Sequence, residues 1–416
     1  MFSDEQTLSL ADVHGPSFYL VDIEKFRENF SKLLGAFKAH YPNTKIAYSY
    51  KTNYLPNLCA AVNQLGGYAE VVSSMEMELA RRLHILDSNI FFNGPIKGAE
   101  AVSSLLANGG TVNIDSLDEF VTIVGWLKQA QVDQISLGIR CNFDVMDDAN
   151  SRFGLDPESA EFKHIMNECV RHPKINLTGF HCHFASRAIE SWTSRATEMV
   201  AFLQQVPDEI FAGLKQVSMG GGMSGEMPDE MQRQFRHNIP TFEEYALAAA
   251  EPFAQLIKLR GGIGEPELII EPGTALAANV VNFVCSIASI KEIRGETVIT
   301  TSGSVYNINP APNRINMPIK VIPQCGDRDV KSVSDARLVG FTCIETDCLY
   351  RGFSGQIAVG DLLWLEQVGA YSIVMKPPFI LPNVAIIEFD RQTGQTRIIK
   401  RAETFDDVFS TYNMGA

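Results

Sequence analysis

Apolar residues along the first two thirds of the chain follow two alternating spacings. Short apolar runs of strand length cover residues 45–51, 68–73, 89–94, 111–115, 134–142, 176–185, 214–222 and 267–273. Helix-like stretches with apolar residues three and four positions apart lie between them, as in 23–41, 74–86, 116–129, 158–171, 190–203 and 241–259. A strand followed by a helix, repeated over about 250 residues, is typical of an α/β fold of the TIM-type (β/α) barrel class. An open doubly wound sheet is the alternative, but eight units of this length favour a closed barrel.

The pattern changes after Gly273. Strand-like runs cover 280–293, 297–301, 337–345, 362–371, 384–389 and 395–402, with few helical stretches between them. This predicts an all-β (Greek-key-like) C-terminal domain over 276–416, after a barrel over 23–275. Another strand-like run, 17–21, precedes the barrel, and we expect the segment 1–22 to join the β domain.

Composition and charge narrow the class of partner. Of 416 residues, 35 are Lys or Arg and 49 are Asp or Glu, so the net charge is −14. This charge argues against general binding of nucleic acid or anionic membranes, which requires a basic surface. The sequence has no run of about 20 apolar residues, so we expect no membrane span. The first residues lack the pattern of a signal peptide. The eight cysteines include no CxxC pair. We therefore expect a cytoplasmic enzyme with mostly buried thiols.

Polar side chains or glycines stand at the end of every predicted barrel strand, where barrels place their active sites. The sharpest is Lys51, which closes the run AYSYK; a desolvated lysine there can form a Schiff base, although a lone lysine more often reaches solvent. The glycines of MGGG can bind an anion through their amides, or simply form a tight turn. Glu271 can pair with a protonated pyridine nitrogen, or with Arg140 across the barrel mouth.

Two further groups of residues could take part in the chemistry of a site. His181 and His183 share a strand face and could bind a metal, but no further ligands stand out, so a histidine stacked on an aromatic cofactor fits better and we expect no metal. In GFTCIETD, Cys343, Glu345 and Asp347 alternate, which predicts one face of an extended strand. A thiol with two carboxylates suits proton transfer; the alternative is a buried cysteine beside surface acids.

The ordered set of motifs resembles a known family. AYSYKTN, AEVVSSMEME, NGPIK, NIDSLDE, RCN, SRFGL, GFHCHFAS, MGGG, EPG, GFTCIETD and VGAY occur in the order found in the alanine-racemase-fold enzymes that use pyridoxal 5'-phosphate (PLP), in the branch of diaminopimelate, ornithine and arginine decarboxylases. The resemblance implies a PLP-dependent amino-acid decarboxylase that forms a homodimer with shared active sites.

The resemblance also implies roles for individual residues. Lys51 would hold PLP as a Schiff base, His183 would stack on its ring, and Glu271 would pair with its pyridine nitrogen. Cys343 would protonate the carbanion across the dimer interface. The other implied cofactor-binding residues are Glu70 near the lysine, Ser186, Gly220, Gly221, Gly222 and Tyr371 at the phosphate, and Gly273 in the EPG motif. The implied substrate-binding group is Arg152, Ile344, Glu345 and Asp347, of which Asp347 keeps the family spacing from the cysteine.

Three departures from the family pattern bear on the substrate and the cofactor phosphate. Ile344 stands where the family has an acid for the distal amine of the substrate, and an apolar side chain cannot pair with a buried ammonium. Thr274 replaces the arginine of EPGR, and Ala185 replaces a glycine. We therefore expect a substrate other than lysine, ornithine or diaminopimelate, such as an amino-acid conjugate or a natural-product or siderophore-type precursor.

Three other functions remain open from the sequence. A racemase or epimerase of the same fold needs a second base opposite Lys51, where this chain offers Cys343. A non-catalytic homologue that binds a partner protein is a different class, and retention of Lys51, Glu271 and Cys343 argues against it. A metal-dependent barrel hydrolase ranks third.

Overall fold

The computed structural model describes residues 2–145, 151–309 and 315–415 and divides the chain into two compact units. The barrel unit comprises Arg27–Ser224 and His237–Ala275. The β unit comprises Met1–Phe26, Gly225–Arg236 and Leu276–Ala416. The short segment Gly225–Arg236, which lies within the range predicted for the barrel, groups with the β unit. Each unit is described here by itself.

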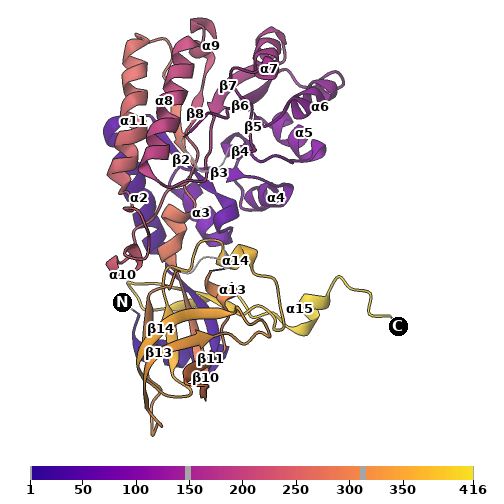
Figure 1. Cartoon of the computed structure of the whole chain (residues 1–416). Coiled ribbons are helices and arrows are strands. Elements are labelled where there is room, and N and C mark those ends of the chain that lie inside the picture. Colours follow the sequence, from indigo (N-terminus) through magenta and orange to yellow (C-terminus); the bar gives the residue numbers. More distant parts are fainter. Residues whose placement is uncertain (1, 146–150, 310–314, 416) are drawn as a thin grey trace. The chain divides into compact units, whose positions relative to one another are not determined.

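Eight parallel strands close the barrel (Figure 1). They are β2 (Thr44–Ser49), β3 (Tyr68–Val71), β4 (Ile90–Phe92), β5 (Thr111–Ile114), β6 (Ile135–Arg140), β7 (Ile175–His181), β8 (Gln216–Ser218) and β9 (Glu267–Ile270). Each strand pairs with the next, and β9 pairs with β2 in parallel, which closes the ring. The predicted TIM-type barrel is confirmed, and the open doubly wound sheet is wrong.

Helices follow the barrel strands because the sequence marks their starts and buries one side of each. The barrel helices are α2 (Ile23–His40), α3 (Pro56–Gln64), α4 (Ser74–Arg82), α5 (Ala99–Ala107), α6 (Leu117–Leu127), α7 (Ala160–Arg171), α8 (Ile189–Gln205), α9 (Asp208–Gly213) and α11 (Phe242–Leu259). Ser73, Ser116, Ser159 and Thr241 each accept a hydrogen bond from a backbone amide of the first turn, which satisfies donors that would otherwise lack a partner. Short 3₁₀ turns η1 (Tyr50–Thr52) and η2 (Asp87–Asn89) follow β2 and precede β4, and α12 (Thr274–Ala277) and η3 (Ala278–Val280) follow β9.

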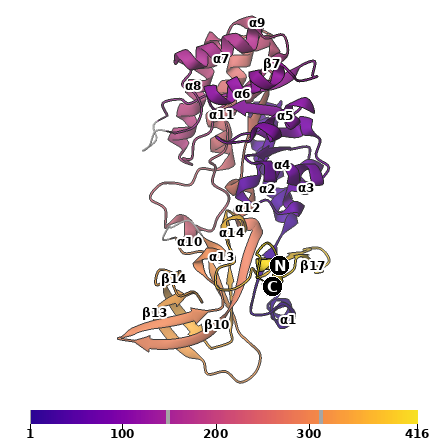
Figure 2. The ribbon, with the colours of Figure 1, turned by 90° about the vertical axis from the view of Figure 1, so that its right-hand side faces the viewer.

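The β unit is built on one large sheet. Its strands are β1 (Ser17–Val21), β10 (Val281–Ile293), β11 (Glu296–Thr301), β12 (Ile319–Ile322), β13 (Lys331–Val339), β14 (Cys348–Ile357), β15 (Leu362–Leu365), β16 (Ala385–Phe389) and β17 (Thr396–Lys400). The order is β14-β13-β11-β10-β1-β16-β17, and β15 pairs with both β10 and β12. Figure 2 shows the long strands β10, β13 and β14 of this sheet. Short helices accompany it: α1 (Asp4–His14), α10 (Asp229–Gln232), α13 (Val305–Ile308), α14 (Ser372–Met375) and α15 (Phe405–Phe409).

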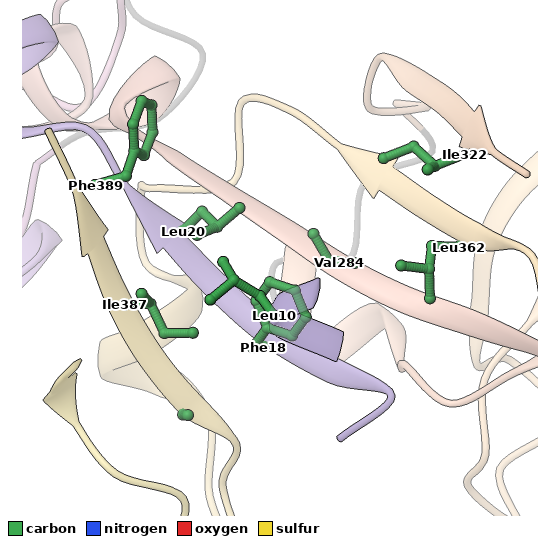
Figure 3. Close-up of a cluster of buried hydrophobic side chains, with 9 residues drawn as sticks. Leu10, Phe18, Leu20, Val284, Ile322, Leu362, Ile387 and Phe389 are labelled. Atoms are coloured by element: carbon green, nitrogen blue, oxygen red, sulfur yellow. The ribbon is translucent and has the colours of Figure 1, made fainter. Parts of the chain in front are cut away.

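The N-terminal strand β1 lies inside this sheet, antiparallel to β10 and parallel to β16. All five of its residues are buried, so a continuous apolar run is what this position requires. Side chains from β1 and its neighbours form a cluster around Phe18 and Leu20 (Figure 3). The other members of the cluster are Leu10, Val284, Ile322, Leu362, Ala385, Ile387 and Phe389. The all-β prediction is thus confirmed in that this unit is mostly sheet, although short helices accompany it, and the N-terminal strand contributes to its core.

Two strand predictions in the β unit are wrong at their ends. Strand β13 stops at Val339, and the chain then turns through 340–347 instead of continuing as an extended strand. Strand β15 stops at Leu365, and the region that follows leads into α14. In the described part of the chain, no helix has both the length and the apolar character to cross a membrane.

Candidate active site

Lys51 stands at the end of the first barrel strand, in η1 directly after β2. Its Nζ lies 2.5 Å from Glu70 Oε2 and 3.2 Å from Ser49 Oγ. The lysine side chain is 31% exposed, whereas the Glu70 side chain is only 1% exposed. The ammonium is therefore held at the barrel end by a buried carboxylate on β3, so it is not a lysine that simply extends into solvent.

Glu271 follows β9 and is buried in a second polar group. Its carboxylate lies 3.0 Å from His181 Nε2 and accepts hydrogen bonds from Ser218 Oγ at 2.8 Å and Asn93 Nδ2 at 3.2 Å. Burial alone would raise the pKa of Glu271, but the charge and hydrogen bond of His181 outweigh it and lower the pKa to about 2. Glu271 is therefore an anion at neutral pH.

The alternative partner for Glu271 is wrong. Arg140, at the end of β6, pairs with Asp115 at 3.2 Å and does not reach Glu271. The possible metal pair also separates, because His181 binds Glu271 while His183 lies at the glycine loop. Among the described residues, no three His, Cys, Asp or Glu side chains group as a metal site.

His183 and the glycine loop lie together at the ends of β7 and β8. Gly221 N donates to His183 Nδ1 at 2.9 Å, and Gly220 N donates to Ser218 Oγ at 3.1 Å. Burial and the Lys51 charge hold the pKa of His183 well below its usual range, so the imidazole is neutral. Gly222 has φ +82°, and a Cβ there would lie 2.6 Å from Phe184 O, so only glycine fits this turn. Of the backbone amides of Gly220, Gly221 and Gly222, only that of Gly222 has no acceptor in the described chain, so this amide is open to an anion.

The remaining predicted barrel residues lie around this loop. Ser186 is half-buried, and its Oγ accepts from Ala188 N at 3.3 Å, which leaves its hydroxyl hydrogen available. Gly273 packs so closely on the side chain of Thr52 that a Cβ would clash. Arg187, next in sequence to Ser186, donates from Nη2 to Thr274 Oγ1 at 3.1 Å. A guanidinium therefore stands beside Thr274.

Two supporting residues were missed by the sequence reasoning. Asn93, in NGPIK, links Glu70 to Glu271, since its Nδ2 lies 3.1 Å from Glu70 Oε1; its place at the end of a strand was the available signal. Arg195 is fully buried in α8 and donates to Gly221 O at 2.7 Å and to Ser186 O at 3.1 Å. Its signal was a charge on the apolar face of the helix, three positions after the buried Trp192.

The predicted residues of the β unit lie in a turn, which corrects the prediction of one extended strand face. Asp347 N donates to Ile344 O at 2.9 Å, which closes the turn. Cys343 and Glu345 are exposed, so the alternative of a buried cysteine is wrong. Asp347 is only 2% exposed.

Asp347 is occupied by hydrogen bonds from its own unit. Its carboxylate accepts from Ser304 Oγ at 3.0 Å, Val305 N at 2.7 Å and Thr342 Oγ1 at 2.6 Å. It therefore fixes the shape of the turn that carries Cys343, and its predicted contact with substrate stays a prediction.

The last two predicted residues also have defined surroundings. Tyr371 is the N-cap of α14 in the β unit and has a left-handed backbone, φ +64°. A non-glycine residue in this conformation is strained, and such residues gather at functional sites. Arg152, in the barrel unit, is exposed and holds its guanidinium 4.2 Å from the centre of the Phe153 ring.

Comparison with known families decides which chemistry this arrangement serves. The family model for the pyridoxal-dependent decarboxylase, pyridoxal binding domain, matches residues 27–278. The chain belongs to the pyridoxal-dependent decarboxylase family. It is therefore a PLP-dependent amino-acid decarboxylase, a carboxy-lyase.

Relatives of this decarboxylase match along nearly its whole length. Diaminopimelate decarboxylase of Methanocaldococcus jannaschii is 26% identical over 97% of this chain and 92% of the relative. The Bacillus subtilis enzyme of the same name is 23% identical over 96% of this chain and 92% of the relative. The crystal structure of the M. jannaschii enzyme superposes with a TM-score of 0.84, 22% identity, and coverage of 98% of this chain and 94% of that one. Lysine/ornithine decarboxylase of Vibrio vulnificus, complexed with putrescine, superposes with a TM-score of 0.75, 18% identity, and coverage of 93% and 98%.

The geometry of the barrel end fits PLP. The cofactor requires a primary amine, an anion for its pyridine nitrogen and donors for its phosphate. Lys51, the ionised Glu271, and the donors of Ser186, Arg187 and the Gly222 amide supply these groups within one unit.

Proposed function

We propose that this decarboxylase acts on an amino acid or amino-acid conjugate whose side chain does not end in an ammonium group. The supporting observation is Ile344, which stands next to Cys343 and lines an apolar cavity of the β unit. A buried ammonium beside it would lose its hydration without gaining a carboxylate partner. A natural-product or siderophore-type precursor fits this requirement.

Each barrel residue then has a definite task. Lys51 would hold the cofactor covalently through its Nζ, with Glu70 orienting that amine. Glu271 would keep the pyridine nitrogen protonated, and His183 would cover the ring. When bound, PLP supplies the electron sink that lets the Cα–carboxylate bond break.

We also propose that two copies of the chain share their active sites. Cys343 of the partner subunit would return a proton to Cα after CO2 leaves, and its exposure in the turn suits that role. Arg152, Glu345 and Tyr371 would complete the site as the resemblance implies. All eight cysteines are free, which supports our proposal of a cytoplasmic enzyme.

A racemase would differ from this proposal in its product. Measuring CO2 release alongside chiral analysis of the product therefore separates the two functions. The names of the relatives make diaminopimelate the competing substrate. We expect kcat/KM for lysine, ornithine and meso-diaminopimelate to lie at least about 100-fold below that for the true substrate, about 2.7 kcal/mol in transition-state binding. The measurement is CO2 release from a panel of amino acids and their acylated conjugates.

Ile344→Glu supplies the matched test. We expect it to raise kcat/KM for lysine about tenfold, because it restores a carboxylate for the distal ammonium. Ile344→Val, which keeps the position apolar, should leave lysine a poor substrate. Efficient turnover of lysine, ornithine or meso-diaminopimelate by the unaltered enzyme would show that the proposed substrate class is wrong.

Arg187 is a further proposed phosphate ligand, because its guanidinium stands beside Thr274 and next to Ser186. In the described chain no carboxylate lies within ion-pairing distance of Arg187, and an arginine binds phosphate strongly through charge-assisted hydrogen bonds. We expect Arg187→Met to raise the PLP dissociation constant of the apoenzyme at least about tenfold. Absorbance titration measures this constant without turnover.

Two variants make this test specific. Thr274→Arg, added to Arg187→Met, should recover most of the lost affinity by restoring the arginine of EPGR. Arg171→Met, at an exposed arginine of α7, should leave the dissociation constant unchanged. A PLP affinity that survives Arg187→Met would remove Arg187 from the phosphate site.

A further inference from the structure

The β unit contains a cavity of about 350 Å³ in which two predicted active-site motifs meet. Ile344 enters its wall from the GFTCIETD turn. Met375 and Lys376 enter it from α14, the helix that begins after Tyr371 in VGAY. Phe341 and Phe379 extend the apolar part of the wall. The cavity is thus lined by Thr342 and Ile344, which flank Cys343, and by a segment that begins four positions after Tyr371.

Lys376 is the cationic group of this cavity. In the described chain no carboxylate lies within ion-pairing distance of its Nζ. Glu403 is the acid whose charge acts on Lys376. Its carboxylate already pairs with Lys400 at 3.0 Å and accepts from Asn383 N at 3.0 Å. An ammonium that is partly buried at a cavity without a carboxylate partner is costly unless an anion binds there.

The two aliphatic hydroxyl groups of the same cavity are already used. Ser304 Oγ and Thr342 Oγ1 both donate to Asp347, at 3.0 and 2.6 Å. They have no hydrogen left to donate to a ligand, so recognition of a charged group rests on Lys376, with the Tyr306 hydroxyl as a further polar group in the wall. An apolar wall with one ammonium fits a ligand that has a hydrocarbon stem and an anionic end.

We propose that this cavity binds the side chain of the substrate, with its methylene groups along Ile344 and Phe341 and a terminal carboxylate on Lys376. The inference rests on the proposed function and narrows its substrate class to amino acids with an anionic side-chain terminus. Lys376 is a specificity-determining residue in this assignment and takes no part in bond breaking.

The test compares three amino acids with equal or nearly equal stems, using the holoenzyme. L-2-Aminopimelate ends in a carboxylate, lysine in an ammonium and norleucine in a methyl group. Binding is followed by the change in cofactor absorbance, and CO2 release is measured in parallel. We expect 2-aminopimelate to bind at least about tenfold tighter than lysine. Norleucine should lie between them.

Variants at Lys376 should move this preference in opposite directions. Lys376→Met should remove the advantage of 2-aminopimelate over norleucine, and Lys376→Glu should favour lysine. Lys331→Met, at an exposed lysine of β13, is the matched control and should change nothing. An unaltered preference in Lys376→Met would overturn the assignment, and so would a loss of PLP affinity in that variant, which would place Lys376 at the cofactor phosphate.

The pH dependence gives an independent readout. Burial, aided by the charge of Lys400, lowers the pKa of Lys376 to about 8, while Glu403 acts in the opposite direction. Tyr306 is the other titratable residue in the cavity wall. Because only the protonated amine attracts a carboxylate, the preference for 2-aminopimelate should fall as the pH rises above about 8. A preference that stays flat from pH 7 to 10 would contradict the assignment.

Failure of this inference can be told apart from failure of the proposed function. meso-Diaminopimelate carries both a distal carboxylate and a distal ammonium. Its efficient turnover would overturn the proposed exclusion of diamino acids, while the effect of Lys376→Met on the ratio of 2-aminopimelate to lysine would still decide the role of Lys376. Conversely, slow turnover of all diamino acids with no effect at Lys376 would overturn the inference alone.

Discussion

Lys51→Ala is expected to give a folded protein that has lost its covalent bond to PLP and at least about 10³-fold of its decarboxylation rate. The physical reason is the placement of one primary amine at the barrel end, 2.5 Å from the buried Glu70 carboxylate. Free cofactor lacks this anchored amine and the orientation that it provides. Borohydride reduction followed by peptide mass spectrometry measures the bond, because a pyridoxyl group should appear on the peptide that contains residue 51 in the unaltered enzyme and on no peptide in the variant.

Two controls separate the amine from its charge. Lys51→Arg keeps a cation beside Glu70 but cannot form the bond, so it should also lack the pyridoxyl group. Lys45→Ala removes a lysine from β2, the strand that precedes Lys51; its Nζ lies 6.0 Å from the Tyr68 ring centre, and this variant should keep the modification. A pyridoxyl group on another lysine of the Lys51→Ala protein would show that the assignment is wrong.

The same variant also tests the proposed sharing of active sites. Lys51→Ala and Cys343→Ala subunits should each be slow alone, because each lacks one part of both sites of its dimer. Random mixing should make half of the dimers mixed, with one of two sites intact, and recover about a quarter of the activity. No recovery in verified mixed dimers would show that Lys51 and Cys343 do not act together across subunits.

The barrel was predictable because its signal is repeated. Eight short apolar runs with stretches of helical spacing between them leave little choice of topology, and a motif such as AYSYK places its lysine at a strand end without knowledge of any contact. The polar network was less accessible. Asn93 contacts Glu70, 23 positions away, and Glu271, 178 positions away, and such a bridge exists only after the barrel closes.

The alternation of residue types gave a wrong prediction where a buried polar side chain determines the conformation of the backbone. Cys343, Glu345 and Asp347 alternate like one face of a strand, yet Asp347 accepts four hydrogen bonds from Ser304, Val305 and Thr342 and holds the chain in a turn. Arg195 was missed for a similar reason, because a charge on an apolar helix face has no meaning until the carbonyls of the glycine loop are placed around it. These side chains shape the site through contacts that lie far apart in sequence.

Glu271→Gln is expected to lower kcat by about 10²- to 10³-fold while the protein still binds PLP. The amide keeps the shape of the carboxylate and can still accept from Ser218 Oγ, but it cannot carry the negative charge that His181 stabilises at present. Without that charge the pyridine nitrogen would lose its proton, and the cofactor would accept electrons from the Cα–carboxylate bond less readily. Single-turnover CO2 release measures the chemical step, and absorbance titration confirms that the variant is loaded.

Ser218→Ala is the matched control for Glu271→Gln, because it leaves the charge of the carboxylate and its contact with His181. It removes the hydrogen bond from Ser218 Oγ to the carboxylate and the acceptor of Gly220 N. We expect this control to change the rate by no more than about tenfold, the effect of roughly 1.4 kcal/mol from one buried hydrogen bond. If both variants slow the reaction equally, the hydrogen-bond network matters and the charge does not. If Glu271→Gln decarboxylates as fast as the unaltered enzyme, Glu271 does not control the pyridine nitrogen, and the buried anion then serves only the packing of β9 against β7 and β8.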